Sequence, residues 1–415
     1  MRKGGRKMSN ETTAKAPVAF KTKVILLIIM AIIAFFAGKE FWELRHYKET
    51  FVASEDLTQV KWLSDYLPSL KGTWADTPIY VFDSGVEGGS VFVMGNVHPY
   101  EPASSITTYV MLENIHVTTG KVFIMPQGNF SGSTMGSIGG AYPKYVHIET
   151  EWGEKTYKIG SRESNPLDQW PDPFTYVHYP DGQNLAYQDI RNMNRTYPGR
   201  EDGTLTERAA YAVMEFIRRE KIDISIDIHE ASIMYPVVGT YVAPDSSIDI
   251  AMMAAMTLSD SVFDMKCEAS PKSLKGLSHR EWGDYSDTLA FLMETPEPFI
   301  DRITGPITEN LMLYGMDEFL VKAAEKGLVY VDYPVSYWGV EGEPMWYRVG
   351  RHLSGALEAI NWTGLFYDDK AVEVTWPTYD DLAENGLGYY LHDPALAENI
   401  DRVQVVYHKP VSVNN

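Results

Sequence analysis

Cysteine is almost absent from this sequence of 415 residues, in which Cys267 is the only one. A single cysteine excludes an intrachain disulfide, and with it a disulfide-stapled scaffold or a metal cluster built on cysteines. Low-complexity tracts and internal repeats are also missing, whereas the hydrophobic content of 45% is that of a folded protein. The length is sufficient for one large domain or two ordinary ones.

Positive charge is scarce as well, because 36 Lys and Arg residues face 56 Asp and Glu residues and give a formal net charge of -20 at pH 7. Seven of the basic residues fall within positions 1–23 beside the single Glu11, which is a local charge of +6. The rest of the chain therefore carries -26, since -26 and +6 sum to -20. Such an acidic body repels phosphate backbones, so we expect no nucleic-acid partner.

The longest hydrophobic run without a charge is 24–38 (VILLIIMAIIAFFAG), which follows the basic segment 1–23. Fifteen residues are fewer than the ~20 that a membrane span needs, but residues 16–20 extend the run if Lys21 and Lys23 snorkel. We predict a basic cytoplasmic tail at 1–23, a transmembrane anchor at 24–38 and a juxtamembrane stalk at 39–57, with the body outside the cytoplasm. The alternative is a cleaved signal peptide, which would leave a secreted protein.

Strand-like and helix-like segments alternate beyond residue 57, which predicts an α/β fold. We expect one domain over 58–326 and a small β-rich appendage over the aromatic-rich 327–415. Between 130 and 189 the pattern dissolves into Gly, Pro, Ser and aromatic residues, which we interpret as a long loop. The expected strands are 79–83, 90–95, 121–126, 222–228 and 288–293, and the expected helices are 102–114, 204–220 and 306–326.

His98 and Glu101 stand three residues apart in GNVHPYE, directly after an expected strand. At the carboxyl edge of an open α/β sheet this spacing aims an imidazole and a carboxylate at one ion, although a solvated loop also accounts for the pair. His229 follows the apolar segment 222–228 and is expected at the same edge. Two histidines and one carboxylate leave a coordination position open for water, as in catalytic zinc sites.

Two further motifs supply groups of other kinds. MNRTYPG contains Asn194 and Arg195, which suit a substrate carboxylate, although a surface turn would also account for them. FLMETPEP places Glu294 after a buried strand, where a carboxyl group is costly unless it has a function or a partner. A zinc hydrolase needs a base, so Glu294 is the candidate, with Glu297 as the alternative.

In this order, the motifs resemble the zinc carboxypeptidase superfamily, and in particular its succinylglutamate desuccinylase/aspartoacylase branch. The resemblance covers roughly residues 75–326 and includes a Pro-Gln-Gly-Asn segment at 126–129. It implies a mixed central sheet flanked by helices and a Zn²⁺ ion. The matching residues are His98, Glu101 and His229 for the metal ligands, Asn194 and Arg195 for the asparagine-arginine motif, and Glu294 for the catalytic glutamate.

The sequence departs from the family pattern at several positions. Pro99 stands where a glycine is usual, and Asn192 stands where an aspartate is common. The arginine that polarises the scissile carbonyl has no counterpart at the usual spacing. We predict Arg191 for this role, with Arg162 and Arg280 as alternatives; Arg280 is otherwise expected to bind substrate.

The function expected from these residues is zinc-dependent hydrolysis of an amide bond, in an N-acyl amino acid or at the C-terminus of a peptide. Glu294 would act as general base, and Asn194 with Arg195 would anchor a substrate carboxylate. One alternative is a membrane-tethered, non-catalytic binding module on the same fold. A serine hydrolase is another, but the sequence has no Gly-x-Ser-x-Gly motif. The same ligands also suit cobalt or nickel.

Overall fold

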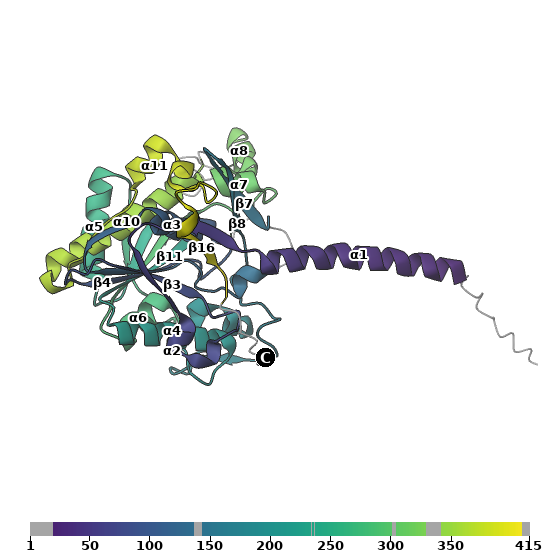
Figure 1. Ribbon diagram of the computed structural model, residues 1–415, viewed down its shortest axis with the longest axis horizontal. Coiled ribbons are helices and arrows are strands. Elements are labelled where there is room, and N and C mark those ends of the chain that lie inside the picture. The colour runs from purple at the N-terminus through teal and green to yellow at the C-terminus, as the bar shows by residue number, and fades with distance from the viewer. Residues whose placement is uncertain are drawn as a thin grey trace, which may run out of the picture. The chain divides into compact units, whose positions relative to one another are not determined.

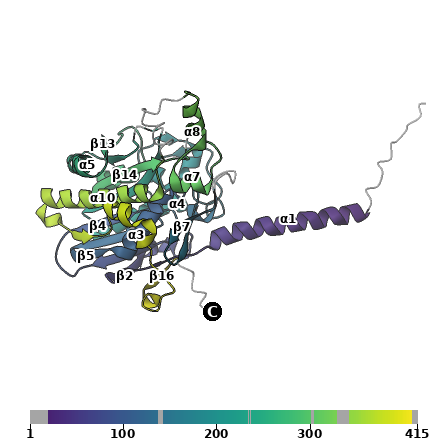
Figure 2. The same ribbon diagram turned by 90° about the horizontal axis from the view of Figure 1, so that it is seen from above.

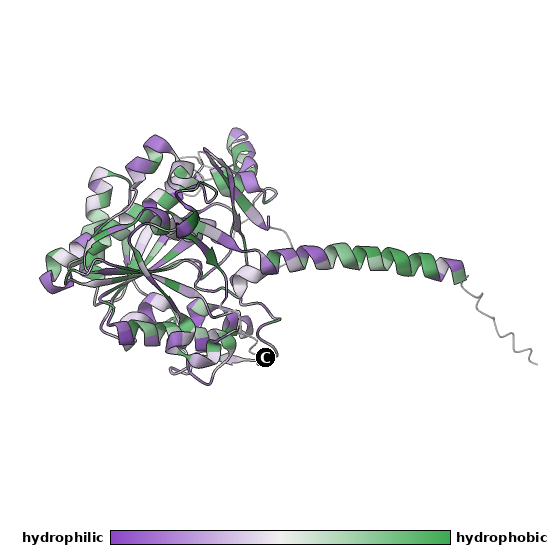
Figure 3. Ribbon diagram, in the orientation of Figure 1, coloured by the Kyte–Doolittle hydropathy of each residue, from purple (hydrophilic) through white to green (hydrophobic). Residues whose placement is uncertain are grey.

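The computed structural model describes residues 20–136, 143–233, 235, 237–300, 304–328 and 342–408. The chain divides into two units, Met1–Glu43 and Leu44–Asn415. Most of helix α1 (Phe20–His46) belongs to the first unit, and this helix of 27 residues is long and apolar enough to cross a membrane or to serve as a signal sequence. Figure 3 shows the apolar stretch along α1 between more polar ends.

An eight-stranded mixed sheet forms the centre of the second unit, in the order β13-β12-β14-β11-β4-β6-β3-β2. The four inner strands are parallel to one another: β6, β4, β11 and β14. On one side β12 pairs antiparallel with β14, and on the other β3 pairs antiparallel with β6 and β2 antiparallel with β3. This confirms the expected mixed sheet. The strands are β2 (Leu57–Trp62), β3 (Pro78–Asp83), β4 (Ser90–Met94), β6 (Lys121–Met125), β11 (Ile224–Ser232), β12 (Thr240–Ala243), β13 (Lys266–Ala269) and β14 (Leu289–Glu297).

Helices cover both faces of this sheet because successive residues of its strands are apolar and point to opposite sides. In β4, Val91 and Val93 join one buried cluster, whereas Phe92 and Met94 join the other. The first face packs against α3 (Pro102–Asn114), α5 (Ile248–Ser261) and α10 (Met345–Phe366), and the second against α2 (Leu63–Tyr66), α4 (Leu205–Glu220) and α6 (Ser278–Tyr285). Figure 1 shows these two layers above and below the sheet.

The C-terminal segment differs from the expected β-rich appendage. Among residues 342–408, α10 alone has 22 residues, and α11 (Tyr379–Asn385) follows it. The strands described there are β15 (Glu373–Thr375) and β16 (Val403–Val406), and each pairs with a distant part of the same unit. Val349, Leu353 and Ala356 of α10 are fully buried in the main core beside α3 and α5 (Figure 2). The aromatic-rich composition of the segment conceals this helical spacing of apolar residues.

Strand pairing also changes the expectation for residues 39–57. Instead of a stalk throughout, Glu49–Val52 form β1, which pairs with β16 and is part of the body. The expected long loop at 130–189 contains a hairpin, β7 (Tyr145–Thr150) and β8 (Gly153–Lys158), and the short strands β9 (Tyr176–Val177) and β10 (Asn184–Leu185). Another short strand, β5 (His116–Thr119), pairs with β15.

The expected helix at 306–326 is broken into α7 (Glu309–Tyr314) and α8 (Glu318–Glu325). Gly315 ends α7 with a φ of 72°, a left-handed conformation that favours glycine, and backbone atoms of Glu343 occupy the space where a side chain would lie. By contrast, α4 begins as predicted, because Thr204 and Glu207 form a reciprocal capping box.

Replacing Leu353 by Ala should show whether α10 belongs to the core. Leu353 is 0% exposed, so the substitution should lower the free energy of unfolding by about 2–5 kcal/mol through lost burial and a residual cavity. Leu365 of the same helix is 70% exposed, and Leu365→Ala should change the free energy of unfolding by less than about 0.5 kcal/mol. Denaturant unfolding of the full chain in detergent measures both; equal effects would contradict the packing described here.

Candidate functional site

The turn between β4 and α3 carries His98 and Glu101. Its course is fixed at Asn96, which has a φ of 59° and whose backbone N–H donates to Ser104 Oγ at 2.8 Å. The Ser104 hydroxyl in turn donates to the carbonyl oxygen of Ile228 in β11 at 2.6 Å. The turn is therefore tied to the neighbouring strand at the level where His229 follows Ile228.

His229 and Glu294 lie within their strands rather than after them, because β11 and β14 continue past the expected ends at 228 and 293. The two strands are parallel, and His229 is in register with Glu294. Parallel pairing thus places a candidate metal ligand and the candidate base side by side, although they are far apart in sequence.

Three side chains converge with the geometry of a metal site. Glu101 Oε1 lies 2.7 Å from His98 Nδ1, and Glu101 Oε2 lies 3.0 Å from His229 Nδ1. One donor atom from each of the three lies within 4.8 Å of the others, and all three residues are buried. Two imidazoles and a carboxylate are a ligand set that zinc accepts, with a fourth position open. The residues present therefore fit a zinc ion.

Hydrogen bonds on the far side of each imidazole orient these ligands. His229 Nε2 lies 2.9 Å from Asp227 Oδ2, a carboxylate oxygen that can only accept, so Nε2 carries the proton. Asp227 Oδ2 also accepts from the Ser278 hydroxyl. His98 Nε2 lies 3.0 Å from Asn192 Oδ1. Both rings consequently turn Nδ1 toward Glu101, which is the orientation that a metal needs.

Burial and charge act against each other at these three residues. Burial lowers the pKa of His98, which keeps it neutral as a ligand must be. Burial alone would raise the pKa of Glu101, but the two histidines outweigh it and lower that pKa. Burial would likewise lower the pKa of His229, yet Asp227 and Glu101 raise it well above the usual value. A metal bound here would displace a proton from His229 Nδ1.

The surroundings of Glu294 favour the protonated form of its carboxyl group. Burial raises its pKa to about 8, His229 opposes this shift, and the carboxylates of Glu101 and Asp227 add to it. Its Oε2 atom is buried and has no hydrogen-bond partner among the described residues. A cation bound by the neighbouring ligands would favour the ionised form of this carboxyl group and lower its pKa.

A cavity of about 230 Å³ opens at the three ligands and Glu294. Asn194 and Arg195 line it, and Arg195 Nη1 donates to the Asn194 carbonyl at 2.7 Å. Arg162 also lines it, with its Nε donating to Tyr100 Oη at 2.6 Å. Apolar side chains form much of the remaining wall: Val237, Val242, Leu274, Leu277, Leu292 and Ile300.

Two predicted arginines are absent from the residues that line this cavity. Arg191 binds Asp172 instead, through Nε at 2.9 Å and Nη2 at 2.7 Å. Arg280 donates through Nε to Ser270 Oγ at 3.1 Å and through Nη2 to the Ser270 carbonyl. The arrangement therefore favours Arg162, one of the stated alternatives, over Arg191 for contact with a substrate carbonyl. His279, beside Arg280 in sequence, does line the cavity.

Sequence reasoning missed a buried ion pair behind the candidate metal ligands. Arg348 of α10 is 0% exposed and lies 2.5 Å from Glu230 Oε1, next to His229 in sequence. Glu230 Oε2 accepts from the backbone N–H of Ala103 at 2.6 Å, two residues after Glu101. No motif surrounds Arg348, and 118 positions separate it from Glu230, so no local signal could have found it.

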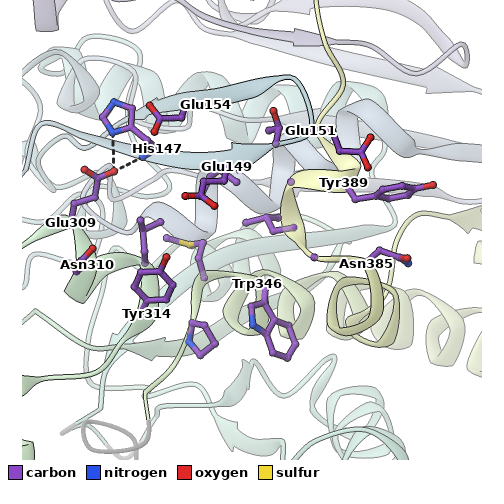
Figure 4. Close-up of a pocket in the computed structure, with 18 residues that line it drawn as sticks. His147, Glu149, Glu151, Glu154, Glu309, Asn310, Tyr314, Trp346, Asn385 and Tyr389 are labelled. Atoms are coloured by element: carbon purple, nitrogen blue, oxygen red, sulfur yellow. Dashed lines mark hydrogen bonds and ion pairs between the residues drawn. The ribbon is translucent and has the colours of Figure 1, made fainter.

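A larger cavity of about 710 Å³ lies against the β7–β8 hairpin (Figure 4). Glutamates and aromatic residues line it, and His147 Nδ1 lies 2.8 Å from Glu309 Oε1 at one end. None of the predicted site residues borders this cavity. Size alone therefore does not locate the chemistry, and the smaller cavity carries the candidate site.

No family model and no curated protein matches the sequence. Solved structures similar to the chain include a metallo-carboxypeptidase from Burkholderia cenocepacia, at 12% identity over 80% of this chain and 68% of that one, with a TM-score of 0.42. An aspartoacylase family protein from Mesorhizobium loti matches at 16% identity over 60% and 66%, with a TM-score of 0.34. A succinylglutamate desuccinylase from Silicibacter sp. matches at 17% identity over 53% of each chain, with a TM-score of 0.33.

These proteins are of the types that the sequence motifs resemble. The chain spans about half the length of the desuccinylase, at 53%, and 66% of the aspartoacylase family protein.

Replacing His229 by Ala should abolish metal binding, because it removes one of the three ligand side chains that the described residues bring together. Elemental analysis of the full chain purified in detergent should find about one zinc per wild-type chain and almost none in the variant. His116→Ala is the matched control, since this histidine pairs with Asp56 on the surface. The control variant should bind as much zinc as the wild type. Equal zinc in all three proteins would contradict the assignment.

Proposed function

We propose that this chain is a zinc-dependent hydrolase that cleaves an amide bond, in an N-acyl amino acid or at the C-terminus of a peptide. The observation that carries the proposal is the buried, unpartnered carboxyl oxygen of Glu294, which lines the same cavity as His98, Glu101 and His229. A buried carboxyl oxygen without a hydrogen-bond partner is costly for folding, and a role as general base would explain why this one is present.

Zinc held by His98, Glu101 and His229 would supply a Lewis acid that makes a water acidic near neutral pH. Glu294 takes the proton of the attacking water and returns it to the leaving amine. Burial raises the pKa of Glu294 and a bound cation would lower it, so the ionised form that accepts the proton and the protonated form that returns it are both accessible near neutral pH. Arg162 donates to the oxygen of the scissile carbonyl as negative charge develops there.

Arg195 and Asn194 anchor a carboxylate of the substrate. The Arg195 side chain is held against the Asn194 carbonyl, and the Asn194 side-chain oxygen accepts from the backbone N–H of Ser278 at 2.8 Å. An arginine fixed in this way loses little conformational entropy when it binds a carboxylate. The apolar wall beyond it accommodates an uncharged part of the substrate.

We also propose that α1 anchors the chain in a membrane and that the body lies outside the cytoplasm. The basic residues at 1–23 precede the apolar stretch 24–38 of α1, and Lys and Arg are enriched on the cytoplasmic side of membrane spans. If α1 is instead a cleaved signal sequence, the body is secreted.

A membrane-tethered binding module remains the alternative from another class, and Glu294 separates the two functions. A protein that only binds its ligand has no need of a buried carboxyl oxygen without a partner beside the metal ligands. Turnover of an amide by the purified protein therefore distinguishes a hydrolase from a binding module.

Glu294→Gln should abolish hydrolysis and leave zinc bound, because glutamine cannot accept the proton and none of the ligands changes. The measurement is turnover of N-acyl amino acids and short peptides by the full chain, with zinc content determined on the same samples. Glu149→Gln, on the surface of the β7–β8 hairpin, is the control that should keep full activity. Undiminished turnover by the Glu294 variant would overturn its assignment as base.

Once a substrate is found, the two candidate arginines can be compared directly. Arg162→Met should reduce kcat/KM about 10²–10³-fold, the usual loss when one donor to a developing oxyanion is removed. Arg191→Met breaks a pair with Asp172 that lies outside the cavity and should reduce it less than about fivefold, or less than about 1 kcal/mol. The opposite ranking would restore Arg191 as the residue that polarises the carbonyl.

A further inference from the structure

The two histidine ligands are supported by groups of different charge. Behind His229, Nε2 meets the carboxylate of Asp227 at 2.9 Å. Behind His98, Nε2 meets the side-chain amide oxygen of Asn192 at 3.0 Å. Asp227 and Asn192 are 0% and 1% exposed, so solvent does not screen the difference in charge between them.

The orientation of the Asn192 amide follows from its second contact. The backbone N–H of Asn194 points at the same Oδ1 atom, at 3.0 Å, and a backbone N–H can only donate. The atom that it meets is therefore the amide oxygen rather than the nitrogen. That oxygen can only accept a hydrogen bond, so the proton of the neutral His98 ring is on Nε2. Nδ1 then carries no proton, and its lone pair can bind a metal.

Capping alone does not explain an amide at this position. Asn192 is the N-cap of the short 3₁₀ turn at Met193–Arg195, in which its side chain accepts from Asn194. Asparagine and aspartate are about equally good N-caps, and an aspartate would accept both hydrogen bonds equally well. The amide also leaves its own nitrogen buried without a partner among the described residues. A carboxylate in its place would differ chiefly in charge.

The negative charge that an aspartate at position 192 would add matters because other carboxylates already lie close by. Glu101 lies between the two histidines, Asp227 lies behind His229, and Glu230 follows His229 in sequence, so three carboxylates already surround the two rings. A fourth carboxylate behind His98 would make that imidazole a stronger electron donor to a metal and would hold the cation more tightly. The neutral amide of Asn192 fixes the His98 ring without making the ring a stronger electron donor to a metal.

We propose that Asn192 is a positioning residue that holds His98 through a neutral amide, so that the metal is bound more weakly and stays more electrophilic than it would with a carboxylate there. The proposal rests on the metal site of the proposed function. It concerns the strength with which that site holds its ion, a property that the hydrolase proposal leaves open.

Asn192→Asp tests this charge with almost no change of shape. The full chain in detergent is stripped of metal, and its affinity for Zn²⁺ is measured by competition with a chromophoric chelator. We expect the variant to bind zinc about 10-fold more tightly, the lower end of the range seen when the partners of metal-binding histidines are changed. Equal or weaker binding would overturn the proposal.

Asp227→Asn is the matched variant at the other histidine, and it should weaken zinc binding about 10-fold for the same reason. The double variant, Asn192→Asp with Asp227→Asn, moves the carboxylate from one ring to the other and should bind zinc within about threefold of wild type if the two effects simply add. A double variant as weak as Asp227→Asn alone would contradict an effect of charge at position 192.

Thermal unfolding of each variant in excess chelator separates metal affinity from folding. A purely structural role for Asn192 predicts a changed unfolding temperature and an unchanged affinity, which overturns the proposal. If wild type binds zinc but Asn192→Asp binds no better, this inference fails and the hydrolase proposal stands. If wild type binds no zinc at all, both fail together.

Discussion

The candidate site depends on the parallel pairing of β11 with β4 on one side and with β14 on the other. Parallel strands end at the same edge of a sheet, so this pairing brings the turn after β4, the end of β11 and the end of β14 together. His98 and Glu101 come from the first, His229 from the second and Glu294 from the third. A slip of one residue between β11 and β14 would turn either His229 or Glu294 to the opposite face.

The same edge concentrates buried negative charge, and the surrounding structure compensates for most of it. Glu101 is held by two histidines, and Glu230 is paired with Arg348. Glu297 accepts from the backbone N–H groups of Phe299 and Ile300. Glu294 and Asp227 are compensated less fully, because one oxygen of each has no partner among the described residues. Placing a carboxyl group in this way weakens folding locally and keeps a proton acceptor available.

Local signals in the sequence predicted the elements nearest the site. The ranges of α3 and α4 are close to those expected, because a proline at the first helical position and a Thr-x-x-Glu capping pair act within a few residues. The four motifs likewise identified the residues that border the cavity at its polar end. Each of these features is set by neighbours in the chain, which a sequence displays directly.

Features that depend on distant partners were predicted poorly. The buried role of α10 is decided by α3 and α5, and composition gave no sign of it. Arg191 was preferred over Arg162 because it lies near Asn194 in sequence, whereas the structure gives Arg191 a partner in Asp172 and leaves Arg162 at the cavity. The ends of β11 and β14 were placed too early, because their last residues stay paired with each other although His229 and Glu294 are polar.

The contact of Arg348 with Glu230 has a consequence for the order of events during biosynthesis. The ligand-bearing turn and β11 emerge from the ribosome well before α10, and until α10 arrives Glu230 is an unpaired acid next to His229. Forming the pair closes a loop of 118 residues, and such long-range contacts form late in folding. A nascent chain therefore carries His98, Glu101 and His229 while the support behind them is incomplete. The edge of the sheet that bears these residues is completed only when α10 docks and Arg348 reaches Glu230.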